Sequence, residues 1–83
     1  CTVSAGTFPA GSQQIGLYFG ACPLTDLSVA LFDANGALHH RESIAAVSEN
    51  NWYSLRVSAL SPGIYFLKVQ AAEGSQTLKV IVI

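Results

Sequence analysis

The stretch LSPGIYFLKV, residues 60–69, contains the pattern that decides the fold. Proline presets its own φ and glycine allows a bend that a side chain would hinder, so Pro62 and Gly63 predict a turn before an extended segment. In that segment apolar side chains recur at every second position, which is the period of a β-strand with one face against a core. The predicted core-facing residues of this strand are Tyr65, Leu67 and Val69.

Tyr65 also stands where a tyrosine corner would place it, near the start of a strand and shortly after Leu60 and Pro62. In such a corner the tyrosine hydroxyl bonds to the backbone a few residues upstream. The alternative is that Tyr65 is simply a core residue. Both interpretations make this stretch structural.

Four other stretches show the same alternation of apolar and smaller or polar residues. Their predicted core-facing rows are Ile15, Leu17 and Phe19; Leu27, Val29 and Leu31; Tyr53, Leu55 and Val57; and Leu78, Val80 and Val82. The sequence DANG at 33–36 predicts a hairpin, because Asn35 and Gly36 tolerate positive φ, and ALHHRES then returns antiparallel.

Turn residues punctuate the rest of the chain at short intervals. A polar loop is predicted at 48–51 and a final hairpin turn at 73–75. With a short first strand near residues 1–5, the elements number seven. Seven short strands with turns between them predict an all-β fold, a seven-stranded immunoglobulin-like sandwich, in a single domain over residues 1–83.

Composition narrows the classes of partner. Apolar residues make up 51% of the 83 residues and charged residues only 11%, against about 25% charged in an average soluble domain. We therefore expect a neighbouring domain or another partner to cover part of the surface. The net charge of −1 offers no basic stripe for nucleic acid and no polybasic patch for a membrane, and no apolar run is long enough to span a bilayer.

The N-terminal region contains two cysteines, Cys1 and Cys22. They could form one disulfide, which would suit an exported protein, or remain two thiols, because spacing alone does not prove pairing. A lipid-modified N-terminus at Cys1 is a further alternative. Because the chain begins at Cys1 and lacks a basic-then-apolar leader, we expect a domain cut from a longer, processed protein.

The sequence lacks the patterns that signal chemistry. His39 and His40 are adjacent, so on a strand they point to opposite faces and cannot both bind one ion without a bulge. No paired carboxylates, zinc-type cysteine spacing, phosphate loop or nucleophile motif occurs. We therefore expect no enzyme, cofactor, metal or small-molecule substrate. Trp52 could be an exposed contact, although packing over a sheet edge is the favoured interpretation.

Three stretches in order, VALFDANGALHH, LRVSALSPGIYFLKVQ and the terminal GSQTLKVIVI, resemble the C-terminal sorting domain of proteins exported by the type IX (Por) secretion system of Bacteroidetes. The resemblance covers residues 27–83, and residues 1–26 form a divergent N-terminal part without the frequent PNP opening. The last strand has one lysine, Lys79, where a basic pair is common in the family.

The resemblance implies a folded export signal that passes from the periplasm to the outer membrane and cell surface. Its partners would be the type IX translocon with its outer-membrane shuttle and sortase, and the domain would be their substrate. Gly36 matches the hairpin glycine of the family. The implied recognition residues are Gly63, Tyr65, Leu67, Lys68, Val69, Leu78, Lys79, Val80, Ile81, Val82 and Ile83.

A terminal strand with a free edge could be bound by β-augmentation, or could pair with a second copy of the domain. Ile81 and Ile83 alternate away from the predicted core row and would then be exposed apolar contacts. The alternative is that both faces of this strand are buried. A different class of function also stays open, namely an immunoglobulin-like structural or adhesive module of a bacterial surface protein.

Overall fold

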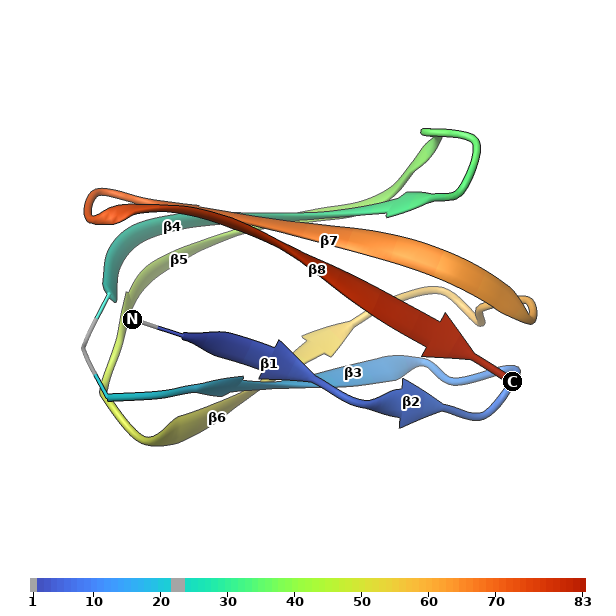
Figure 1. Cartoon of the computed structure of the whole chain (residues 1–83), viewed down its shortest axis with the longest axis horizontal. Coiled ribbons are helices and arrows are strands. Elements are labelled where there is room, and N and C mark those ends of the chain that lie inside the picture. Colours follow the sequence, from blue (N-terminus) through green and yellow to red (C-terminus); the bar gives the residue numbers. More distant parts are fainter. Residues whose placement is uncertain (1, 22–23) are drawn as a thin grey trace.

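The computed structural model describes residues 2–21 and 24–83, which form two β-sheets packed face to face (Figure 1). The smaller sheet has the strand order β1-β3-β6 and the larger the order β2-β8-β7-β4-β5. Their bounds are β1 Val3–Ala5, β2 Thr7–Phe8, β3 Gln14–Phe19, β4 Leu24–Asp33, β5 Leu38–Val47, β6 Asn51–Arg56, β7 Gly63–Ala71 and β8 Gly74–Val82. The all-β sandwich is confirmed, but the described residues form eight strands where the sequence predicted seven.

The extra strand arises because the N-terminal segment changes sheets. β1 pairs antiparallel with β3, whereas β2 pairs parallel with β8 in the other sheet, with Gly6 between them. The sequence predicted one short strand over 1–5. Two residues between a glycine and a proline cannot show an alternating pattern, so β2 left no signal.

The core lies between the sheets and is built from the alternating rows. All five predicted rows face it: their members are buried, apart from Tyr53 and Leu78, which pack against it and are partly exposed. Fully buried side chains come from β3, β4, β6, β7 and β8, so both sheets contribute to the centre of the core.

Both predicted hairpins are present. At the β4–β5 turn the Asp33 carboxylate accepts hydrogen bonds from the amides of Asn35 and Ala37, each at 2.9 Å, and Gly36 has φ +86°. In the β7–β8 hairpin Ala71 pairs with Gly74, so the turn lies one residue earlier than predicted.

The tyrosine corner is confirmed. The Tyr65 hydroxyl donates a hydrogen bond of 2.8 Å to the Ser61 carbonyl, and its ring belongs to the core with 5% of the residue exposed. Gly63 precedes it with φ +152°, a conformation that side chains disfavour. The turn that begins β7 is therefore held by a side-chain hydrogen bond and by glycine.

The favoured interpretation of Trp52, that it packs over a sheet edge, is wrong. Trp52 lies on the outer side of the smaller sheet and is 68% exposed. Its ring meets Tyr18 edge-on with centroids 5.1 Å apart and lies close to Gly16. Its alternation in β6 with the inward Tyr53 and Leu55 explains the exposure.

The proposed disulfide between Cys1 and Cys22 concerns residues outside the described ranges. Within those ranges, no helix has the length and apolar character needed to cross a membrane.

Candidate functional site

The strands with the recognition motif, β7 and β8, form one antiparallel hairpin whose two faces differ. Cross-strand partners share a face, so the pairs Tyr65–Val80 and Leu67–Leu78 point into the sandwich. The intervening pairs, Ile64–Ile81 and Phe66–Lys79, point outward. We call the outward side of the larger sheet the outer face.

The eleven residues implied by the family resemblance divide between these faces. Five are buried in the core and a sixth, Leu78, packs against it. The buried five are Tyr65, Leu67, Val69, Val80 and Val82. The exposed members are Gly63, Lys68, Lys79, Ile81 and Ile83. Of the eleven residues, these exposed five are the ones that a partner can contact most readily in the folded domain.

The predicted apolar contacts on β8 are exposed. Ile81 is 38% and Ile83 73% exposed, so the alternative that both faces of the last strand are buried is wrong. When large apolar residues are exposed next to one another, they indicate a surface that contacts a partner.

The structure adds apolar residues that sequence reasoning did not select. Ile64 and Phe66 alternate with the β7 core row and are 43% and 40% exposed. Phe66 pairs with Phe32 of β4, and Phe32 pairs with Leu38 of β5. In the sequence, Ile64 and Phe66 occupy the even-numbered positions of β7, which alternate with the odd-numbered core row. We define the outer apolar cluster as Phe32, Leu38, Ile64, Phe66 and Ile81.

The edge of β8 is not free at its C-terminal end. β2 pairs with it there, with Thr7 opposite Ile81 and Phe8 opposite Val82. The Ile83 amide donates to the Phe8 carbonyl at 2.9 Å and the Ala10 amide donates to the Ile83 carbonyl at 2.6 Å. The prediction of a free terminal edge is therefore wrong for this segment, because main-chain groups that β-augmentation needs are already paired.

The clearest polar contact between the sheets lies between β5 and β6. The Tyr53 hydroxyl donates a hydrogen bond to the Glu42 carboxylate, and His40 Nε2 lies 3.1 Å from the other carboxylate oxygen. The Tyr53 hydrogen bond is the main cause that lowers the pKa of Glu42, and the same bond raises the pKa of Tyr53. This cluster connects the two sheets through side-chain contacts.

The two histidines lie in separate environments. His39 Nε2 is 2.9 Å from the Asp33 carboxylate, and its ring meets Tyr65 edge-on, whereas His40 contacts Glu42. The hydrogen bond from His39 is the main cause that lowers the pKa of Asp33. Over residues 2–21 and 24–83, no group of three or more potential ligands could hold a metal ion.

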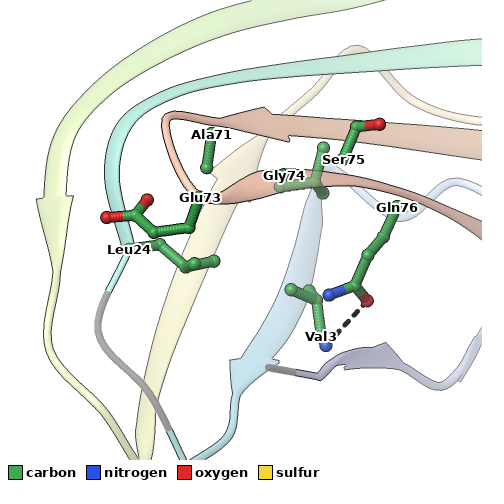
Figure 2. Close-up of a pocket in the computed structure, with 8 residues that line it drawn as sticks. Val3, Leu24, Ala71, Glu73, Gly74, Ser75 and Gln76 are labelled. Atoms are coloured by element: carbon green, nitrogen blue, oxygen red, sulfur yellow. Dashed lines mark hydrogen bonds between the residues drawn. The ribbon is translucent and has the colours of Figure 1, made fainter.

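A hollow of about 340 Å³ opens beside the β7–β8 turn, at the end of the hairpin opposite Ile81 (Figure 2). Its lining includes Val3, Leu24 and Glu73, and the Val3 amide donates a 3.2 Å hydrogen bond to Gln76 Oε1. Among the described residues of the lining, Glu73 is the one that titrates, and its carboxylate accepts hydrogen bonds from the amide and hydroxyl of Thr25.

Comparison with known proteins agrees with this architecture. The model of one protein family, described as the secretion system C-terminal sorting domain, matches residues 9–83. The match begins well before residue 27, so it includes most of the N-terminal part that lacked recognisable motifs. No curated protein matches the chain.

Among solved structures, CopC from Methylosinus trichosporium OB3b is similar in fold. The two chains superpose with a TM-score of 0.65 at 19% sequence identity, over 99% of this chain and 89% of that one. At this level of identity the likeness supports the β-sandwich and carries no information on function.

Proposed function

Since this chain belongs to the family of secretion system C-terminal sorting domains, we propose that the secretion machinery reads the outer face of its β7–β8 hairpin. The chain is a C-terminal sorting signal of type IX secretion, and the protein that carries it is exported through the outer membrane to the cell surface. An independent structural or adhesive module is the less favoured function.

The outer apolar cluster is the observation that carries the proposed surface. Monomeric domains seldom place several large apolar side chains side by side in water unless something binds there. Here Ile64, Phe66 and Ile81 do so on the two strands that carry the family's motif, while the core residues between them fix their positions. Gly63, Lys68, Lys79 and Ile83 border this surface.

The partners would be the type IX translocon and its outer-membrane shuttle and sortase, met after passage through the periplasm. Recognition would use side chains of the outer face, because the C-terminal end of β8 already pairs with β2. Sorting domains of this family are not enzymes, and we propose that this chain is a substrate of the machinery that catalyses nothing itself.

The test is delivery of a reporter fused before residues 1–83 in a Bacteroidetes host. The double variant Ile64→Ser with Ile81→Ser removes two exposed apolar contacts, and we expect the reporter to stay in the periplasm. Trp52→Ser is the matched control, because Trp52 is exposed on the other sheet. Normal surface delivery of the double variant would contradict the proposed surface.

A further inference from the structure

The outer face carries its charges in an ordered way. Across the larger sheet, Arg41 of β5 pairs with Ala30 of β4, Ala30 pairs with Lys68 of β7, and Lys68 pairs with Thr77 of β8. We call these four residues the cationic row. Next to it lies a row of Leu38, Phe32, Phe66 and Lys79, so that most of the outer apolar cluster directly borders cations.

Three of the four lysine and arginine residues of the chain therefore share one face. They are Arg41, Lys68 and Lys79, whereas Arg56 belongs to β6 of the smaller sheet. The net charge of the chain is −1, so an overall excess of positive charge does not explain why three cations share this face.

The carboxylates lie elsewhere. Asp33 and Glu42 pair with inward positions, opposite Tyr65 and Val29, and bond to the two histidines. The others are at turns or strand ends away from these rows: Asp26, Glu49 and Glu73. Among the described residues, no ion pair of Arg41, Lys68 or Lys79 with a carboxylate is formed.

The three cations are close enough to act together. Lys68 and Lys79 are diagonal neighbours on adjacent strands, and at this register their Cα atoms are about 7–8 Å apart. Arg41 and Lys68 are two strands apart, at about 10 Å for a strand spacing of about 4.8 Å. These separations are within or near the Debye length of about 8 Å at physiological salt, so the positive potentials of the three cations overlap on the outer face.

We propose that the outer face binds an acidic protein surface, in which carboxylates flank an apolar centre that covers Phe66 and its neighbours. This inference rests on the proposed function and specifies the chemistry of the partner at that site. Charge complementarity would steer the encounter and fix its orientation, while apolar burial supplies most of the affinity.

An anionic lipid surface is the other source of negative charge, and the geometry disfavours it. Sequence-readable lipid recognition usually needs clusters of about 4–8 lysine and arginine residues. Here there are three cations, spread over three strands of a sheet, and Ile64, Phe66 and Ile81 are less than half exposed. Side chains of this kind contact a complementary protein surface more readily than they insert into acyl chains.

The binding test uses two synthetic extended peptides with alternating leucine, one with glutamate and one with glutamine at the intervening positions. The glutamate peptide should bind more tightly, and its affinity should fall as the Debye length shrinks from about 30 Å to about 3 Å between about 0.01 M and 1 M salt. Replacing Arg41, Lys68 and Lys79 by glutamine should weaken binding by about twofold to fivefold for each cation. Arg56→Gln is the matched control and should leave the affinity unchanged.

Equal binding of both peptides, or binding only to phosphatidylglycerol vesicles, would overturn the acidic-protein proposal. Reporter delivery separates it from the proposed function. Retention of both the triple glutamine variant and the Ile64→Ser, Ile81→Ser variant supports both proposals. Normal delivery of the triple variant with retention of the isoleucine variant overturns the acidic partner and leaves the recognition surface standing.

Discussion

Substitutions at two adjacent residues of β7, Leu67 and Phe66, should have very different effects on the stability of the domain. Leu67 is fully buried between the sheets, whereas Phe66 is 40% exposed on the outer face. Leu67→Ala removes buried methyl groups and leaves a cavity, which typically costs about 2–5 kcal/mol of unfolding free energy. A domain of 83 residues has a total stability of only about 4–12 kcal/mol at about 0.05–0.15 kcal/mol per residue, so this loss is a large fraction of it.

Phe66→Ser should cost much less. The change removes a partly exposed side chain and its cross-strand contact with Phe32, a type of pair that contributes about 0.2–1 kcal/mol. Urea unfolding measures both variants. With an m-value of about 1 kcal/mol/M, the midpoint should fall by about 2 M or more for Leu67→Ala and by about 1 M or less for Phe66→Ser. A greater loss of stability for Phe66→Ser than for Leu67→Ala would refute the assignment of the two faces.

Three further predictions concern local features. Tyr65→Phe keeps the ring and removes the corner hydrogen bond, so it should cost about 1 kcal/mol in urea unfolding, and an unchanged midpoint would show that this bond contributes nothing. Gly36→Ala should cost about 1–2 kcal/mol by the same measurement, because alanine is strained at positive φ, whereas equal stability would argue against the turn. The pKa values of Asp33 and Glu42 are lowered in the folded state, chiefly by the hydrogen bonds from His39 and Tyr53 respectively, so their stabilisation is present above the unfolded pKa near 4 and is lost as pH falls through the lower folded values. Acid unfolding followed by circular dichroism should begin below about pH 4 and be less steep in Asp33→Asn, and an identical pH profile would contradict the role of Asp33.

The alternation of apolar residues was sufficient to predict the faces of the strands. In β3, in β4 from Leu27 onward and in β7, the odd-numbered apolar residues belong to the core, since the side chains of a strand point alternately to its two sides. The hairpin at Asp33 was predictable for an equally local reason, because short-range hydrogen bonds and Gly36 determine its shape.

Long-range pairing was not predictable from the sequence. The pairing of Thr7 and Phe8 with the end of β8 joins segments more than seventy residues apart, and a two-residue strand has no pattern of its own. The β4 strand begins at Leu24 and continues through Asp26, whose φ of +52° interrupts the alternation, so its first residues did not look like part of a strand.

The candidate site illustrates the same limit. The family motif selected positions on β7 and β8, but half of those residues stabilise the core. Which exposed residues gather around them depends on neighbouring strands, as the pairing of Phe66 with Phe32 shows. The cationic row likewise becomes visible only when the register places Arg41 beside Ala30 and Ala30 beside Lys68.

Deletion of residues 77–83 removes Val80 and Val82 from the core, so it would trap the reporter by unfolding the domain whether or not the outer face is recognised. The most direct test of the central claim is therefore surface delivery of the reporter carrying Ile64→Ser with Ile81→Ser, measured beside Trp52→Ser, with urea unfolding to verify that both variants are folded. We expect the double variant to fold and remain in the periplasm, and the control to reach the surface. Equal delivery of the two folded variants would contradict the central claim.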